Sequence, residues 1–296
     1  MLGLLGTIRL PFLPLTPICV LLAVAAAGYG GRAIDAQSVW LALIGAIAAS
    51  IAVNAFNEYV DFRNGLDLRT IRTPFSGGSG TLPAHPELAR PTLIMATLSL
   101  STVVLIGVWF LLEHGLALLP IGLTGVLLVA FYSTWVVHHP VICLLAPGFG
   151  FGTLMVLGTA WVATGEFTST AFAASLIPFF LVSNLLLLNQ FPDLDADRAV
   201  GRNTLPIAIG MRRSSYVYLA FVLLGAASLV ASIGMRWLPP QAAVGLLGFA
   251  LAVPVFVGAR RYGTDIDRLK PFMALNTIIC LVTPLLVAAG LYLAAR

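Results

Sequence analysis

The sequence is divided into long apolar runs separated by short polar connections. A helix needs about 20 apolar residues to cross the hydrocarbon core of a bilayer, and nine runs approach that length. They cover residues 10–28, 39–60, 92–112, 116–137, 141–163, 170–190, 215–234, 241–259 and 273–294. Only 9% of the 296 residues are charged, whereas a soluble domain has about 25%. The sequence therefore predicts an all-α polytopic membrane protein with nine transmembrane helices.

The distribution of basic residues predicts the orientation. With nine spans, the N-terminus and the loops after the second, fourth, sixth and eighth runs share one face. That face carries thirteen of the sixteen basic residues: Arg9, Arg63, Arg69, Arg72, Arg90, Arg198, Arg202, Arg212, Arg213, Arg260, Arg261, Arg268 and Lys270. The other face carries Arg32, Arg236 and Arg296. Because basic loops stay in the cytoplasm, we expect a cytoplasmic-membrane protein whose N-terminus and long loops face the cytoplasm. A net charge of +4 then reflects topology, and no nucleic-acid partner is expected.

A first acidic cluster closes the second run, in "NAFNEYVDFRNGLD" at residues 54–67. Asn54, Glu58 and Asp61 have the spacing i, i+4, i+7, which places them on one face of a helix. Asn64-Gly65 is expected to end the helix, and Asp67 can return to the same pocket from the loop.

A second cluster closes the sixth run, in "NQFPDLDADRAVGRNTLP" at residues 189–206. Asn189, Asp193 and Asp197 are spaced i, i+4, i+8 and again share a face, while Asp195 is expected to point elsewhere. Pro192 is expected to kink the end of the membrane helix. The two clusters lie four runs apart, as a duplicated four-helix unit would place them.

Carboxylates at these positions need a positive partner. They are predicted at helix C-termini, where the macrodipole disfavours negative charge. Oxygen ligands without nearby His or Cys suit a hard cation, above all Mg²⁺. The clusters therefore predict a magnesium site.

The loop after the first cluster has the composition of a phosphate site. Arg69 and Arg72 lead into "SGGSG" at 76–80, where glycines allow backbone N–H groups to approach an anion. Arg202 follows the second cluster. Metal, arginine and amide groups together can hold a diphosphate. An allylic diphosphate would leave a carbocation that needs a dry, aromatic-lined pocket. The candidate lining residues are Phe56, Phe131, Tyr132, Trp135, Phe149 and Phe151.

The two acidic motifs together resemble those of the UbiA superfamily of intramembrane prenyltransferases. The most similar branch contains the 1,4-dihydroxy-2-naphthoate prenyltransferases, which "AFYSTW" at 130–135 and "LGTAWVATGEFT" at 157–168 also resemble. The resemblance covers about residues 10 to 290. It implies one domain over 1–296, a bundle around a central cavity that opens sideways to lipid, and cap loops at 54–90 and 189–213. It also implies Mg²⁺-dependent transfer of a prenyl group from an isoprenyl diphosphate to a small, usually aromatic acceptor, with no protein partner.

The resemblance also assigns residues. The implied Mg²⁺ ligands are Asn54, Glu58, Asp61 and Asp67 for one ion, and Asn189, Asp193 and Asp197 for the other. Asp61 and Asp193 are the implied catalytic carboxylates, and Tyr132 would face the allylic cation or the acceptor. Arg72 and Arg202 would bind the diphosphate, with Asn54, Asn189 and Ser133 as further substrate-binding candidates.

One stretch departs from the family pattern. Residues 136–152, "VVHHPVICLLAPGFGFG", contain His138 and His139 where the family usually has a basic residue and then an acid. The identity of the acceptor is therefore left open, and so is the prenyl chain length. A terpene cyclase, which needs no acceptor, is an alternative within the same fold. A secondary transporter is a second alternative, but its acids should lie at the bilayer midplane, whereas these clusters lie at helix ends.

Overall fold

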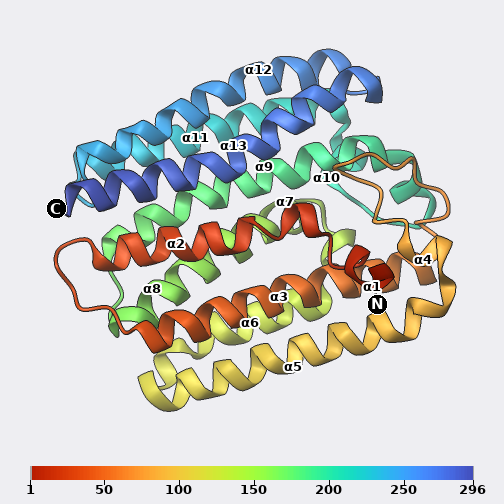
Figure 1. The fold of residues 1–296 in the computed structure, drawn as a ribbon. Coiled ribbons are helices and arrows are strands. Elements are labelled where there is room, and N and C mark those ends of the chain that lie inside the picture. Colours follow the sequence, from red (N-terminus) through yellow and green to blue (C-terminus); the bar gives the residue numbers. More distant parts are fainter. Residues whose placement is uncertain (1, 296) are drawn as a thin grey trace.

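The computed structural model describes residues 2–295, and every regular element in that range is a helix. This confirms the all-α prediction. The longer helices are α2 (Leu15–Gly28), α3 (Ala36–Arg63), α5 (Ala89–His114), α6 (Leu119–Phe131), α9 (Ser169–Ala199), α11 (Met211–Gly234), α12 (Leu246–Tyr262) and α13 (Ile266–Ala294). The shorter ones are α1 (Leu2–Gly6), α4 (Thr81–Ala84), α7 (Pro140–Gly148), α8 (Leu157–Thr164) and α10 (Leu205–Ile209). Figure 1 shows the long helices as a bundle of roughly aligned rods.

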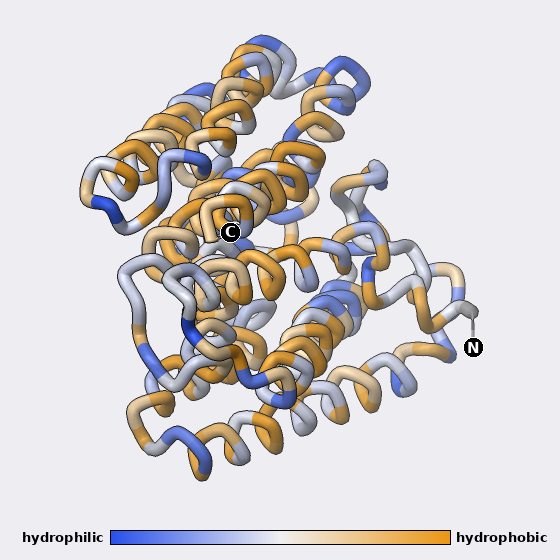
Figure 2. Tube along the Cα trace, turned by 60° about the vertical axis from the view of Figure 1, so that its left-hand side comes forward, coloured by the Kyte–Doolittle hydropathy of each residue, from blue (hydrophilic) through white to orange (hydrophobic). Residues whose placement is uncertain are grey.

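Eight helices within the described residues are long and apolar enough to cross a membrane. Figure 2 shows the hydrophobic residues along these rods and the hydrophilic ones gathered mainly at their ends. The predicted run 116–137 differs from the other eight. Its continuous helix covers only Leu116–Phe131. The chain turns after Phe131, where the Ser133 hydroxyl accepts a hydrogen bond of 3.2 Å from Asn57 of α3, and a short 3-10 helix follows at Val136–His138.

Helix α9 forms the centre of the bundle. Within its most apolar window, 72% of the residues are buried, against 44% or less in the other candidate spans. It packs against α11 and α13 on one side and against α2 and α7 on the other (Figure 1). The predicted run ended at residue 190, but α9 continues to Ala199. Pro192 removes one backbone donor without ending the helix, so the whole second acidic cluster lies on α9.

Helices α7 and α8 are joined by a π-helix, η5 (Phe149–Val156), into one membrane rod. Pro147 has no N–H to donate, and the helix widens just after it. The rod approaches α9 closely because two glycines face it. A Cβ atom on Gly148 would lie 2.0 Å from the Phe179 carbonyl oxygen, and one on Gly152 would lie 2.5 Å from the Phe179 nitrogen. Small residues at a four-residue spacing are typical of such close packing.

The two acidic clusters lie at the same end of the bundle. The connection that follows α3 and the one that follows α9 meet there, beside the N-terminal segment (Figure 1). The C-terminal end of α13 lies at the opposite end of the bundle.

Candidate active site

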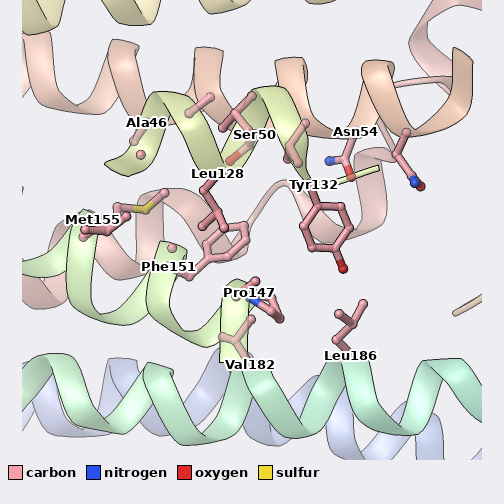
Figure 3. A pocket seen from close by; sticks show the side chains of 18 of the residues that line it. Ala46, Ser50, Asn54, Leu128, Tyr132, Pro147, Phe151, Met155, Val182 and Leu186 are labelled. Carbon is pink, nitrogen blue, oxygen red and sulfur yellow. The ribbon is translucent and has the colours of Figure 1, made fainter. Parts of the chain in front are cut away.

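A cavity of about 620 Å³ lies between α3, α5, α6, η5 and α9. Its walls are mainly apolar side chains of these helices, as Figure 3 shows for Leu128, Phe151, Met155 and Val182. The polar residues that line it include Arg9, Asn54, Asn57, Asp61, Asp67, Tyr132, Asn189, Gln190, Asp193, Asp197, Arg202 and Thr204. The cavity thus joins an apolar chamber to a polar end formed by both acidic clusters.

Within the first cluster, Asp61 and Asp67 line the cavity, as does Asn54. The loop returns as predicted, since the Asp67 N–H donates to the Asp61 carbonyl at 3.3 Å. Glu58 is fully buried, and its carboxylate is held by the protein itself. Arg9 Nε donates to Oε1 at 2.9 Å, the Ser79 N–H to Oε1 at 2.8 Å, and the Ser79 hydroxyl to Oε2 at 2.7 Å. Glu58 therefore anchors the glycine loop, and its predicted role as a metal ligand stays a prediction.

Within the second cluster, Asn189, Asp193 and Asp197 line the cavity. The side chain of Asp195 is 96% exposed, which confirms that it points away from the other three. The glycine loop reaches this cluster as well, because the Gly77 N–H donates to Asp193 Oδ2 at 3.2 Å.

Arg202 joins the two clusters. Its Nη1 donates to Asp197 Oδ1 at 3.0 Å, and its Nη2 forms an ion pair with Asp61 Oδ1. Burial alone would lower the pKa of this guanidinium, but the carboxylates of Asp61 and Asp197 outweigh burial and raise the pKa. Arg202 is therefore a permanent positive charge at the polar end of the cavity.

Of the polar lining residues named above, Arg9, Asn57, Gln190 and Thr204 were not among the sequence candidates. Asn57 lines the cavity, and its side chain contacts Arg9 at 2.8 Å and Ser133 at 3.2 Å. Its signal was present in the sequence, because Asn57 and Asp61 have the same four-residue spacing as Asn189 and Asp193. Arg9 had no such signal, because nothing near it in the sequence predicts a contact with α3.

The glycine loop, residues 76–80, has a backbone that only glycine adopts easily. Gly77, Gly78 and Gly80 all have positive φ, between 71° and 85°. The backbone N–H groups of Gly77 and Ser79 donate hydrogen bonds to carboxylates of the protein itself. The anions that the loop holds are therefore the side chains of Asp193 and Glu58. Arg72 donates to the Asp67 carbonyl at 3.4 Å and is not among the residues that line the cavity.

The aromatic lining was predicted in part. Tyr132 and Phe151 line the cavity, and Figure 3 shows Tyr132 projecting inward with its hydroxyl directed toward the side of Leu186. The prediction for Phe131 and Trp135 was wrong, because both are about half-exposed on the outer surface. Phe56 and Phe149 are not lining residues either, whereas Phe12, Phe75 and Phe110 are. Helical spacing alone could not say which face of each helix turns inward.

The model of the UbiA prenyltransferase family matches residues 16–293. The chain belongs to the UbiA prenyltransferase family.

Among curated relatives, it is 27% identical to the 1,4-dihydroxy-2-naphthoate octaprenyltransferase of Escherichia coli, over 98% of this chain and 94% of that protein. It is 28% identical to the enzyme of the same name from Bacillus subtilis, over 54% of this chain and 51% of that protein. It is also 29% identical to the digeranylgeranylglyceryl phosphate synthase of Natronomonas pharaonis, over 65% of this chain and 64% of that protein. The match thus spans about half of the Bacillus enzyme and less than two thirds of the Natronomonas one.

Solved UbiA homologues share the fold. The apo structure from Aeropyrum pernix superposes with a TM-score of 0.71 at 19% identity, over 94% of this chain and 97% of that one. A homologue from Archaeoglobus fulgidus bound to GPP and Mg²⁺ superposes with a TM-score of 0.59 at 15% identity, over 97% of this chain and 99% of that one.

The donor atoms of this family member suit a hard cation. Among residues 2–295, no three His, Cys, Asp or Glu side chains form a group able to hold a metal ion. However, Asp67 Oδ2, Asn189 Oδ1 and Asp193 Oδ1 are buried oxygens without a hydrogen-bond partner in the described structure, and all three residues line the cavity. Buried polar atoms are normally paired. Burial and the charges of Glu58 and Asp61 raise the pKa of Asp67 to about 7, as expected for a carboxylate that lacks a cationic partner.

Proposed function

We propose that the protein transfers a prenyl group from an isoprenyl diphosphate to a small aromatic acceptor and releases diphosphate. The observation that carries this proposal is the pairing of an apolar chamber with a polar end that holds Arg202 and three unpaired carboxylate or amide oxygens. A substrate with an apolar chain and a multiply charged head matches both parts. The names of the relatives, two of them dihydroxynaphthoate prenyltransferases, support the same class of reaction.

The proposal includes Mg²⁺. The chemistry of the donor set favours Asp61, Asp67, Asn189, Asp193 and Asp197 as its ligands, since each presents a hard oxygen to the cavity. The Glu58 carboxylate is already engaged with Arg9 and Ser79. Asn54 donates its Nδ2 to the Ile8 carbonyl, which leaves its Oδ1 as a further candidate ligand. Bound there, the ion would neutralise charge on the departing diphosphate.

The residues of the chain would act on the substrate as follows. Arg202 and Arg9, which both line the polar end of the cavity, would attract and orient the diphosphate, with Arg72 as a further candidate at the loop. The apolar walls would hold the prenyl chain and exclude water from the allylic carbon. Tyr132 would present its ring to the developing cation. The carbon–oxygen bond to diphosphate breaks, a bond to the acceptor ring forms, and the ring releases one proton.

We also propose nine spans with a cytoplasmic N-terminus. The shorter apolar helix Leu116–Phe131, formed by α6 and the turn before it, would be the additional span. The thirteen-to-three split of basic residues then sets the orientation. Single-cysteine variants at Arg69 and Arg236 test this in intact cells. A membrane-impermeant maleimide should label the Arg236→Cys variant and not the Arg69→Cys variant, and the reverse pattern would invert the topology.

The test of function uses the full chain in detergent with geranylgeranyl diphosphate and Mg²⁺, with and without 1,4-dihydroxy-2-naphthoate. Diphosphate release that depends on the naphthoate, with a prenylated product by mass, is the expected result. Release without acceptor, giving a hydrocarbon or an alcohol, would instead identify a terpene cyclase. Magnesium-independent release would contradict the proposed role of the carboxylates.

A further inference from the structure

Two unpaired polar groups of the cavity lie outside the acidic clusters. Gln190 Oε1 and Thr204 Oγ1 are both buried and have no hydrogen-bond partner in the described structure. Gln190 is 6% exposed and Thr204 is 3% exposed, and both line the cavity. Two such groups on the wall of one cavity indicate a ligand that completes their hydrogen bonds.

These groups share one wall of the cavity. Gln190 Nε2 donates to Cys143 Sγ of α7 at 3.4 Å, and Tyr132 also hydrogen-bonds with Cys143. Thr204 immediately precedes α10, which contacts α7. We call the residues Tyr132, Val137, Cys143, Gln190 and Thr204 the α7 wall.

The α7 wall is held in place by the stretch that departs from the family pattern. The Asn203 N–H donates to the Val137 carbonyl at 3.1 Å, and His138 Nδ1 lies 2.9 Å from the Gly201 carbonyl oxygen. Val137 and Cys143 pack in one small apolar cluster with Tyr132 at its edge. The positions of Gln190 and Thr204 are therefore set before any substrate binds.

The chemistry of the wall differs from that of the acidic clusters. One N–H of the Gln190 amide is donated to Cys143, and the unpaired amide oxygen, as a carbonyl, can only accept a hydrogen bond. A diphosphate, which has only acceptor oxygens, cannot pair with that oxygen. A hydroxyl group on an aromatic ring satisfies it, and Thr204 can donate to or accept from a second oxygen. Tyr132 and Val137 offer the ring an apolar surface.

From this geometry we infer that the α7 wall is the binding site of the acceptor, and that the acceptor is an aromatic compound with at least one free hydroxyl group held by Gln190 and Thr204. The inference rests on the proposed prenyl transfer and adds the acceptor subsite. It gives Gln190 and Thr204 the role of positioning the acceptor ring beside the allylic carbon.

Calorimetry can measure the affinity of the full chain in detergent for 1,4-dihydroxy-2-naphthoate in the absence of diphosphate. This measurement tests the inference independently of turnover. Gln190→Met and Thr204→Val keep side-chain size; the first removes the free amide oxygen together with the donor to Cys143, and the second removes the hydroxyl group. Each should weaken naphthoate binding about tenfold, whereas Thr204→Ser should bind like the wild type. Thr283→Val is the matched control, because Thr283 Oγ1 is buried and unpaired but is not among the residues that line the cavity.

Two further measurements separate the possible outcomes. The Mg²⁺-dependent affinity for geranylgeranyl diphosphate should stay unchanged in Gln190→Met and Thr204→Val. The dimethoxy analogue of the naphthoate, which cannot donate to Gln190, should bind equally weakly to the wild type and to Gln190→Met. Equal loss of diphosphate affinity, unchanged naphthoate affinity in both variants, or no naphthoate binding by the wild type would overturn the inference. Naphthoate binding without any turnover would overturn the proposed function and leave the subsite standing.

Discussion

Gly77 and Asp193 are joined by a hydrogen bond across 116 positions of the chain, from the backbone N–H of the glycine to a carboxylate oxygen at 3.2 Å. The same loop donates to Glu58 through Ser79. The glycine loop therefore holds one carboxylate of each acidic cluster and fixes their separation. Any change that moves the Gly77 N–H should disturb both clusters together.

Gly77→Ala is the first prediction. Gly77 has φ 85°, and an added Cβ would lie 2.9 Å from Thr70 Cγ2 and 3.0 Å from the Arg72 Cα. The substitution should displace the loop and lower diphosphate release by about tenfold or more. Gly165→Ala is the control, because Gly165 has φ 77° and no neighbour within 4 Å. Both variants should lose roughly 1–2 kcal/mol of stability, and equal activities in the two would contradict a role for the loop.

The second prediction concerns the carboxylates. Asp61→Asn and Asp193→Asn should each lower diphosphate release by about 10²–10³-fold while the protein stays folded. Asp195→Asn is the control on the same helix, since that side chain is 96% exposed and should retain wild-type turnover. Near-normal turnover in Asp61→Asn and Asp193→Asn would remove these residues from the reaction.

How far the sequence predicted this site depends on the range of each contact. Helical spacing correctly separated Asp195 from Asp193 and Asp197, because residue positions around a helix are a local property. The ion pair of Arg9 with Glu58 was not predicted, since it joins residues 49 positions apart and depends on how the N-terminal segment folds back. Spacing also favoured Asn54 over Asn57, although the contacts of Asn57 are the ones that reach Arg9 and Ser133.

The charged ends of the helices were not predictable from hydropathy, for the same reason. Loss of hydropathy placed the end of the sixth run at residue 190, yet α9 continues to Ala199. Ion pairing and loop contacts stabilise the charged last turns, and hydropathy does not report these contacts. The fold class and the meeting of the two clusters were predictable, whereas the contacts that hold them together were not.

The third prediction concerns Arg202, which is 11% exposed between Asp61 and Asp197. Arg202→Leu leaves two buried carboxylates without their cation and should cost about 3–5 kcal/mol of stability. Arg198→Leu is the control, because Arg198 is 60% exposed and lies 4.0 Å from Asp195. Thermal unfolding in detergent with EDTA measures both, and similar melting temperatures in the two variants would show that the Arg202 bridge is not structural.

Asp67 gives the fourth prediction, on the pH dependence of stability in the absence of metal. Burial, followed by the charges of Glu58 and Asp61, raises its pKa to about 7, against about 3.9 in an unfolded chain. The native state therefore binds this proton more tightly than the unfolded state does. The resulting stabilisation is complete below about pH 4 and is lost as pH rises through about 7.

In EDTA, the melting temperature of the wild type should accordingly fall as the pH rises from about 4 to about 7 and level off above that range, where Asp67 is ionised in both the native and the unfolded state. Asp67→Asn cannot ionise at this position, so its melting temperature should fall less over the same interval. The comparison isolates one group, because Glu58, Asp61, Arg9 and Arg202 face Asp67 in both proteins. Parallel pH profiles of the two melting temperatures would show that the Asp67 carboxyl is not the group that titrates. They would also show that burial of its unpaired Oδ2 costs no electrostatic free energy.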